Sequence, residues 1–309
     1  EMSFATQEDV FAVGEEVLSS VFEKFAPEGS VVTKAPYPII SYKQAMLEFG
    51  SDKPDLRNPL RIIDVTDFFQ KCTFKPFIGK TVRAIRVHTD MSKGFHEKLL
   101  KFATGLAGLE VGDTIFFMAD KEERAAYYAG MIRNELGEKL DLIEKNAYRF
   151  CYVNDFPMFE KDPETKKIGF THNPFSMPQG GLEALNTMDP LDILAYQYDI
   201  VCNGVELSSG AVRNHDMQIM EKAFEIAGYD KEVLKNKFGA LYTAFQYGAP
   251  PHAGMAPGVD RMIMLLRNEE NIREVIAFPM NGNAQDLMCG APNEVTEQQL
   301  REVHIKVRD

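Results

Sequence analysis

The segment YDIVCNGVELSSGAVRNH, residues 198–215, carries the residue types that are best suited to chemistry. Asp199 and Glu206 lie seven positions apart, and Arg213 follows seven positions later. Two carboxylates near an anion-binding Arg suit a Mg²⁺–polyphosphate site, because Mg²⁺ takes one or two carboxylates together with phosphate oxygens. Strand positions seven apart point to opposite faces, so a common site requires a turn or bulge at Asn203–Gly204. The alternative is a solvated strand face with a cross-strand ion pair.

A second segment, GAPPHAGMAPGVDRMIMLL at residues 248–266, combines a Gly- and Pro-rich approach with helical apolar spacing from Val259 onward. This pattern predicts an amphipathic helix with one buried face. Arg261 falls off that face, near the helix start. Unpaired N–H groups and a partial positive charge at a helix start favour anions, so a guanidinium there makes a good anion site. The alternative is an ordinary surface pair of Asp260 and Arg261.

His172 and Asn173 lie in the segment THNPFSMP, a loop that two prolines constrain. Polar groups on a rigid loop favour substrate contact, whereas a lone loop His is otherwise a capping or packing residue. The histidines show no HxxxH or HExxH spacing, and the four cysteines form no CxxC pair, so neither pattern indicates a metal. We find no GxSxG elbow, no Walker loop and no GxGxxG opening a βαβ unit, so hydrolase and Rossmann interpretations lack support.

Composition limits the class of protein. The 309 residues, 45% of them hydrophobic, suffice for two domains with substantial cores. The formal net charge of −12 disfavours a general nucleic-acid coat, although a local basic groove stays open. No apolar run is long enough to span a bilayer, and the start EMSFATQEDV lacks the regions of a signal peptide. With no disulfide framework, we expect a soluble protein in a reducing, cytoplasmic setting.

The elements that would position these residues can be read from periodicity. Residues 6–26 predict a helix with Thr6 as N-cap, and its apolar positions are Val10, Val13, Val17, Leu18, Val21 and Phe22. A short strand at residues 39–40 and a helix capped by Ser41 follow. The segment GSDKPDLRNP, residues 50–59, is rich in turn formers and charge and indicates a domain boundary.

Residues of about 60–148 indicate a separate α/β unit. Within it we expect a half-buried strand at KTVRAIRV, a helix at MSKGFHEKLLKFATGL, a buried strand at DTIFFMAD and a long helix at KEERAAYYAGMIRNELGEKL. Later segments predict a strand at 149–159 that closes on a turn at 155–157, helices at 216–226 and 231–246, and a C-terminal strand that contains His304. Strands that return through short loops favour an antiparallel sheet with helices packed on it.

The motif at residues 248–266 closely resembles motif 3 of class II aminoacyl-tRNA synthetases, and of the bacterial aspartyl enzymes in particular. GSDKPDLRNP, DFPMFE, THNPFSMP, YDIVCNGVELSSGAVRNH, IREVIAFP and APNEV resemble further family blocks in the family's order, over most of residues 1–60 and 149–309. The resemblance implies an α/β (α+β) fold with an antiparallel sheet flanked by helices. It also implies a catalytic domain in two parts, 1–59 and 149–309, around a GAD-type insertion at 60–148.

The resemblance further implies an aspartate–tRNA ligase. Such an enzyme joins L-aspartate to ATP as aspartyl-adenylate with Mg²⁺, releases pyrophosphate, and passes the aspartyl group to tRNA(Asp), in some members also to tRNA(Asn). A homodimer is implied for the full-length protein, and no membrane is involved. Adenylation is an in-line displacement in which the protein positions groups and neutralises charge. No side-chain nucleophile is needed, which agrees with the absence of one from the motifs above.

Residue roles toward ATP come from the same resemblance. Arg261 matches the motif 3 arginine that holds the γ-phosphate, and Glu206 shares the catalytic role with it. Gly254 and Gly258 would let the nucleotide approach the backbone closely. Asp199 and Glu206 match the acidic residues that hold Mg²⁺ on the phosphates.

Aspartate contacts are implied for two residues. Arg213 matches the arginine that clamps the aspartate side chain, where a bidentate fork gives selectivity that Lys would not. His172 matches a histidine of the loop over the amino acid. Asn173 stands where many members have a second histidine, and cannot titrate. Ser208–Ser209–Gly210 replace a glycine-rich run, which adds two hydroxyls near the substrate.

The start EMSF resembles the end of motif 2, so we expect this chain to be an incomplete and inactive catalytic unit. It would lack the anticodon-binding barrel, motif 1 and most of motif 2, and its insertion is short near residues 101–113. Three alternatives stay open beside a discriminating aspartyl enzyme. They are a non-discriminating aspartyl-tRNA(Asp/Asn) synthetase, a non-catalytic synthetase-like binding protein, and an ammonia-dependent relative that forms asparagine.

Overall fold

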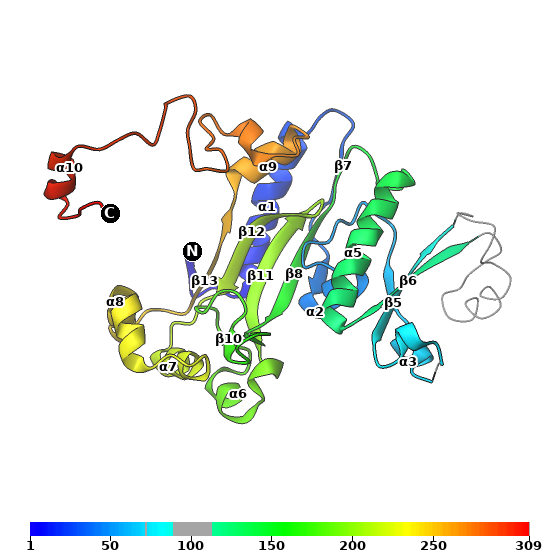
Figure 1. The fold of residues 1–309 in the computed structure, drawn as a ribbon, viewed down its shortest axis with the longest axis horizontal. Helices are drawn as coiled ribbons and strands as arrows, with labels where there is room; N and C mark the ends of the chain where they lie inside the picture. Colours follow the sequence, from blue (N-terminus) through cyan, green and yellow to red (C-terminus); the bar gives the residue numbers. More distant parts are fainter. Residues whose placement is uncertain (72, 89–112, 309) are drawn as a thin grey trace. The chain divides into compact units, whose positions relative to one another are not determined.

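A computed structural model describes residues 1–71, 73–88 and 113–308, which form two compact units (Figure 1). The first unit runs from Glu1 to Pro257, and the second begins at Gly258. The helix expected at residues 91–106 lies outside the described residues. The division at residues 59 and 148 that the family resemblance implies stays a prediction.

A six-stranded sheet forms the centre of the first unit, in the order β1-β13-β12-β11-β8-β3. Every pairing is antiparallel except that of β3 with β8, as the sequence predicted for the sheet as a whole. The bounds are β1 Met2–Ser3, β3 Ile39–Ser41, β8 Phe150–Pro157, β11 Leu194–Cys202, β12 Val205–Val212 and β13 His252–Pro257.

The turn that we expected at residues 155–157 is wrong, because β8 continues through Pro157. The chain bends there instead. Asp155 has a φ of 54°, and the pairing of β8 with β11 shifts register between Ala195 and Tyr198. A bulge of this kind re-aims a strand without ending it, so the turn formers in the sequence mark a kink.

Helix α1, Gln7–Phe25, covers one face of this sheet and has Thr6 as its N-cap, as predicted. Thr6 and Asp9 form a capping box there. A Cβ on Gly14 would lie 2.5 Å from Cε of Met255, so this glycine allows the helix to approach the sheet closely. The buried residues are Val10, Phe11, Gly14, Leu18 and Phe22. Val13 and Val17, two of the apolar positions from which the helix was predicted, are exposed. They lie beside the row of residues spaced four apart that contacts the sheet, and not on it.

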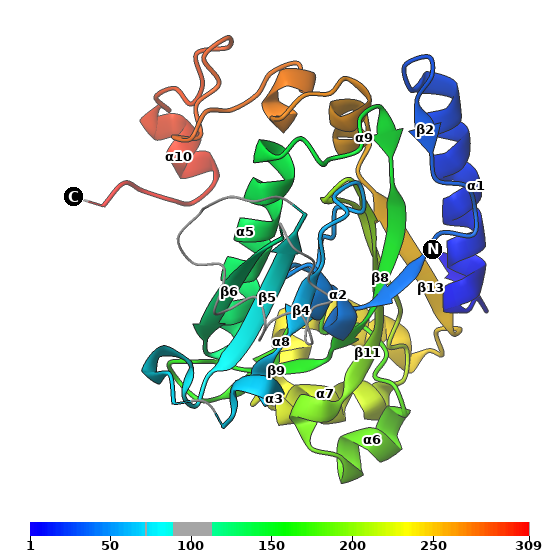
Figure 2. The same ribbon diagram turned by 90° about the vertical axis from the view of Figure 1, so that its right-hand side faces the viewer.

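Helix α2, Tyr42–Glu48, lies on the opposite face and is capped by Ser41 as predicted (Figure 2). Side chains at alternate positions of the central strands pack toward α1 on one face of the sheet and toward α2 on the other. Tyr152 stacks on Phe11 of α1 at 3.7 Å between ring centroids, whereas Val153 and Val201 belong to the core beneath α2. Because strand residues two apart share a face, Asp199 lies on the face of Val201, away from α1.

A second sheet, in the order β4-β5-β6, packs against helix α5. The bounds are β4 Ile62–Asp64, β5 Thr81–Val87, β6 Thr114–Asp120, α3 Thr66–Phe69 and α5 Glu122–Lys139. The central strand β5 is almost wholly buried and not half-buried as expected, because α5 covers one face and Phe69 of α3 packs on the other. β6 is mostly half-buried and not fully buried, since it lies at the edge.

The remaining elements of the first unit are short strands and helices. They are β2 Val31–Val32, β7 Ala147–Tyr148, β9 Phe159–Lys161, β10 Ile168–Phe170, α6 Gly181–Thr187, α7 Met217–Ile226 and α8 Lys231–Gln246, together with 3₁₀ turns at Lys75–Phe77 and Pro190–Asp192. The helices α7 and α8 confirm the predicted pair. Among the described residues, no helix is both long and apolar enough to cross a membrane.

The second unit contains α9, Val259–Leu266, a 3₁₀ turn at Ile272–Val275, and α10, Glu297–Glu302. Helix α9 confirms the helix that the sequence predicted, but none of its residues is buried, so the buried face expected for it is wrong. Val259 and Ile263 of that face are exposed. The strand expected around His304 is wrong. The chain leaves α10 through a turn in which His304 has a φ of 57°, and residues 303–308 join no sheet in the described chain.

Candidate functional site

The hairpin of β11 and β12 brings Asp199 and Glu206 to one face of the central sheet. A two-residue turn at Asn203–Gly204, with φ values of 54° and 80°, joins the strands. Ile200 pairs with Ser208 and Val201 with Glu206, so β12 has one extra residue between these pairs. The turn alone brings the two carboxylates to one face, because Glu206 pairs with Val201, which lies two positions from Asp199 on β11. The bulge acts further along β12, where it brings Arg213 to the same face.

Lys53 joins the two carboxylates. Its Nζ lies 2.7 Å from Oδ2 of Asp199, 3.3 Å from Oε2 of Glu206 and 2.7 Å from Oδ2 of Asp52. Burial lowers the pKa of Lys53, but Asp199 and Asp52 outweigh it and raise the pKa overall, so the ammonium stays charged. Burial raises the pKa of Asp199, although Lys53 acts in the opposite sense. The site therefore holds three carboxylates around one fixed cation.

The oxygen atoms at this site determine whether it can hold Mg²⁺. Oδ1 of Asp199 is buried and has no hydrogen-bond partner within the described residues. An oxygen of this kind is free to accept a cation. Among the same residues, no three His, Cys, Asp or Glu side chains are placed to hold a metal ion. Asp199 and Glu206 therefore fit a cation that brings further oxygen ligands with it, as Mg²⁺ on a polyphosphate does.

Lys53 is held by a loop that α5 anchors. Arg133, which is 1% exposed, donates from Nε to the carbonyl of Leu60 and from Nη2 to the carbonyls of Asp55 and Asn58. Burial lowers the pKa of Arg133 to about 10. α5 also lies close to the loop at its start, because a Cβ on Gly130 would lie 2.8 Å from the carbonyl oxygen of Gly50.

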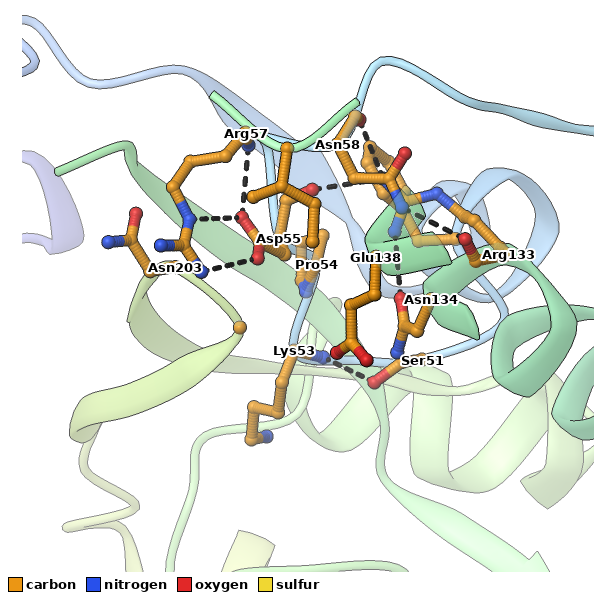
Figure 3. Close-up of a pocket in the computed structure, with 13 residues that line it drawn as sticks. Ser51, Lys53, Pro54, Asp55, Arg57, Asn58, Arg133, Asn134, Glu138 and Asn203 are labelled. Carbon is orange, nitrogen blue, oxygen red and sulfur yellow. Dashed lines mark hydrogen bonds and ion pairs between the residues drawn. The ribbon is translucent and has the colours of Figure 1, made fainter. Parts of the chain in front are cut away.

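A polar cavity of about 320 Å³ lies between this loop, α5 and the β11–β12 turn. Figure 3 shows Arg57 paired with Asp55 on its wall, while the side chain of Lys53 leads away from Arg57. Lys53 Nζ thus reaches the carboxylate pair from the edge of this cavity. The other labelled wall residues are Ser51, Pro54, Asn58, Arg133, Asn134, Glu138 and Asn203.

His172 packs beside the same site. Its ring meets that of Phe156 edge-on at 5.1 Å between centroids, and Lys53 Nζ lies 5.8 Å from the centroid of Phe156. Tyr42 of α2 lies 6.5 Å from His172 by the same measure. Asn173 accepts the N–H of Phe175 with its side-chain oxygen, which fixes the loop. His172 therefore has the packing contacts that one of its two interpretations predicted, and its contact with a substrate stays a prediction.

Arg213, directly after β12, pairs with Glu1 at 2.6 Å between Nη2 and Oε1. Nε donates to the same carboxylate at 3.2 Å, so Glu1 holds one edge of the guanidinium. A Cβ on Gly254 of β13 would lie 2.5 Å from the carboxyl carbon of Glu1. The space over Gly254 therefore holds this carboxylate. By the register of β11 and β12, Arg213 shares the face of Asp199.

The remaining expected residues, Gly258 and Arg261, belong to the second unit. Gly258 is the N-cap of α9 with a φ of −81°, which any residue adopts, and Arg261 follows in the first turn of the helix. The position of Arg261 near a helix start is thus confirmed, and anion binding there stays a prediction.

Sequence reasoning missed Lys53 and Glu1. Lys53 lies in GSDKPDLRNP, which appeared only as a boundary and a family block. Its four charged side chains within six residues were a signal, since a Lys beside Asp52 and Asp55 in a turn-rich segment can reach across to a strand. Glu1 carried no signal beyond its place at the end of a motif 2-like segment.

The family model described as tRNA synthetases class II (D, K and N) matches residues 1–282. The chain therefore belongs to the class II tRNA synthetases of this group, and the antiparallel sheet flanked by helices is the fold of that class.

Within that group the chain is similar to aspartate enzymes, as its motifs indicated. It is 53% identical to the aspartate–tRNA(Asp/Asn) ligase of Zymomonas mobilis, over 99% of this chain and 58% of the relative. It is 49% identical to the aspartate–tRNA ligase of Streptomyces avermitilis, over 100% of this chain and 58% of the relative. The chain thus spans about 58% of the length of these curated relatives.

Among solved structures, the asparaginyl-tRNA synthetase of Entamoeba histolytica is similar over 92% of this chain and 47% of its own, at 15% identity and a TM-score of 0.45. At that distance the similarity adds nothing to the family assignment.

Proposed function

We propose that this chain carries the aspartate-activating centre of an aspartate–tRNA ligase that acts in the cytoplasm. One observation carries the proposal: a bulged hairpin places Asp199 and Glu206 on the same sheet face as Arg213. Carboxylates for a cation and a guanidinium for a carboxylate are the groups that joining aspartate to ATP needs. The similarity to ligases for aspartate supports the same reaction.

Asp199 and Glu206 would hold Mg²⁺, which would neutralise the phosphate charge of bound ATP. Arg261 would bind the γ-phosphate from the start of α9, where the helix N-terminus adds its own preference for anions. Gly258 leaves no side chain beside that position.

Arg213 would clamp the side-chain carboxylate of aspartate. Glu1 holds its Nε–Nη2 edge, and among the described residues no hydrogen bond of Nη1 is found, so the second edge can accept a substrate carboxylate. A guanidinium held at one edge is pre-oriented for a bidentate contact at the other. His172, held by Phe156, would cover the amino group side of the substrate.

The adenylate would then pass its aspartyl group to the terminal ribose of a tRNA, and we expect a homodimer in a protein of the full length of the relatives. The relative from Z. mobilis is named for both tRNA(Asp) and tRNA(Asn), and that from S. avermitilis for one. Assays that measure transfer of aspartate to tRNA(Asp) and to tRNA(Asn) distinguish the two possibilities. A discriminating enzyme charges only tRNA(Asp), and a non-discriminating enzyme charges both.

The test is ATP–pyrophosphate exchange by a chimera. The part of the Z. mobilis ligase that the resemblance places ahead of Glu1 is fused to this chain. We expect exchange that requires aspartate and Mg²⁺ and that glutamate and asparagine do not support. The same chimera with Glu206→Gln should lose at least about 100-fold in rate, as removal of a charge-stabilising group does. Exchange that proceeds equally with another amino acid, or none in a folded chimera, would overturn the proposal.

A further inference from the structure

The position between Asp199 and Glu206, where the proposed function requires a divalent cation, is already taken by an ammonium group. Lys53 Nζ lies 2.7 Å from Asp199 and 3.3 Å from Glu206, and it also bonds Asp52 at 2.7 Å. All three of its N–H groups thus have a carboxylate partner. Lys53 comes from a loop far from the hairpin in sequence, so its presence there is a feature of the tertiary structure.

We propose that Lys53 is the resident cation of this carboxylate pair. It is a positioning residue that holds Asp199 and Glu206 together when no nucleotide is bound, and it keeps divalent cations out of the site until they arrive with phosphate ligands. This inference rests on the proposed function for the identity of the nucleotide, but the role of Lys53 toward cations can be measured without it.

Three observations support this role. The Asp199 side chain is 4% exposed, and two carboxylates brought together at such a depth repel each other unless a cation lies between them. The loop that carries Lys53 is fixed by the buried Arg133, so the ammonium is held in place. The contact with Glu206 is the longest of the three, and Glu206 is the more exposed carboxylate, with 29% of its side chain accessible. Glu206 is therefore the group that a second cation can reach while Asp199 keeps its partner.

A direct consequence concerns divalent cations in the absence of nucleotide. An ammonium between the carboxylates opposes a second cation by charge and by volume. The unaltered chain should therefore bind Mn²⁺, which shares the oxygen ligands of Mg²⁺, only weakly. Lys53→Met, which keeps the length of the side chain and removes the charge, should raise the affinity for Mn²⁺ by at least about tenfold. Lys53→Arg should stay as weak as the unaltered chain.

The experiment is an electron paramagnetic resonance titration of free Mn²⁺ with the 309-residue chain and no nucleotide. Lys231→Met is the matched control, because Lys231 also bonds a carboxylate at 2.7 Å, that of Glu221, but joins α7 and α8. Its Mn²⁺ affinity should equal that of the unaltered chain. Glu206→Gln added to Lys53→Met should abolish the gain, which assigns the bound ion to this pair.

A double variant separates position from charge and guards against misfolding. Lys53→Met with Asp52→Asn has the same net charge as the unaltered chain and one carboxylate fewer to repel. If Lys53 occupies the cation position, the double variant still binds Mn²⁺ more tightly than the unaltered chain. If the double variant binds Mn²⁺ no more tightly than the unaltered chain, overall charge alone matters and the proposal is overturned. The proposal is also overturned if Lys53→Met alone has the same Mn²⁺ affinity as the unaltered chain. Neither result depends on aspartate activation, which the exchange assay tests separately.

Discussion

The contact between Arg213 and Glu1 is the residue-scale feature that ties the site to its surroundings. Glu1 fills the space above Gly254 and holds one edge of the guanidinium. Gly254 thus leaves room for the Glu1 carboxylate that orients Arg213, the residue that we expect to bind aspartate. This role is additional to the approach of ATP that the sequence predicted for Gly254. This contact could not be read from the sequence, because β1 and β13 meet only through long-range pairing.

Gly254→Ala should displace the Glu1 carboxylate and so disorder Arg213. In the chimera we expect the KM for aspartate in the exchange assay to rise about tenfold, as loss of one charge-assisted contact would cause. Gly239→Ala on α8 is the control, because a Cβ there meets no atom within 4 Å. A rise confined to the KM for ATP would show that Gly254 serves the nucleotide and not Arg213.

Arg213→Lys tests the clamp itself. A lysine keeps the charge but loses the planar fork, so it cannot hold Glu1 and a substrate carboxylate at two edges. We expect kcat/KM for aspartate to fall by about 100-fold or more and the KM for ATP to change little. Equal losses toward both substrates would contradict the assignment of Arg213 to aspartate.

At the scale of elements, the sequence was informative where the signal is local. The capping box of α1, the cap of α2 and the pair α7 and α8 follow from residues a few positions apart. Burial was harder to predict. β5 is covered on both faces, which its alternating pattern did not indicate, because the second cover comes from Phe69 and its neighbours. The shared face of Asp199 and Glu206 was foreseen as a condition, whereas Lys53 between them depends on tertiary contacts.

The hydrogen bonds from Arg133 of α5 to the loop that carries Lys53 can be tested by measuring the free energy of unfolding. Arg133→Met removes the donors to the carbonyls of Leu60, Asp55 and Asn58 and leaves them buried. Urea denaturation should show a loss of about 3 kcal/mol or more in the free energy of unfolding. Arg124→Met on the same helix removes only exposed contacts and should stay within about 0.5 kcal/mol of the unaltered chain. Similar small losses for both would show that Arg133 does not fix the loop.

The contact of α7 with α8 makes a prediction about pH. Burial raises the pKa of Glu221, but the hydrogen bonds from Lys231 and Tyr242 outweigh it and lower the pKa below its ordinary value of 4.5. A lowered pKa contributes stability above pH 4.5 that is lost as the pH falls through the folded-state value. Glu221→Gln should cost about 1 kcal/mol at pH 7, and this difference should shrink below pH 4.5. A difference that grows toward low pH in chemical denaturation would contradict the pairing.

At the scale of the whole molecule, the chain spans about 58% of the length of the relatives that it matches. We therefore expect faster aspartate-dependent exchange from the chimera, which has the full length of the relatives, than from the 309-residue chain. Equal exchange rates for the two would show that the added length contributes nothing to aspartate activation.

The central claim is that Glu206 and Arg261 both take part in binding ATP. The most direct measurement is the dissociation constant of a non-hydrolysable ATP analogue with Mg²⁺, measured by calorimetry on the chimera and its variants. We predict that Glu206→Gln and Arg261→Ala each weaken binding by at least about tenfold, as loss of a charge-assisted phosphate contact would, while Arg267→Ala at the far end of α9 has no effect. Unchanged binding in either of the first two variants would contradict the claim.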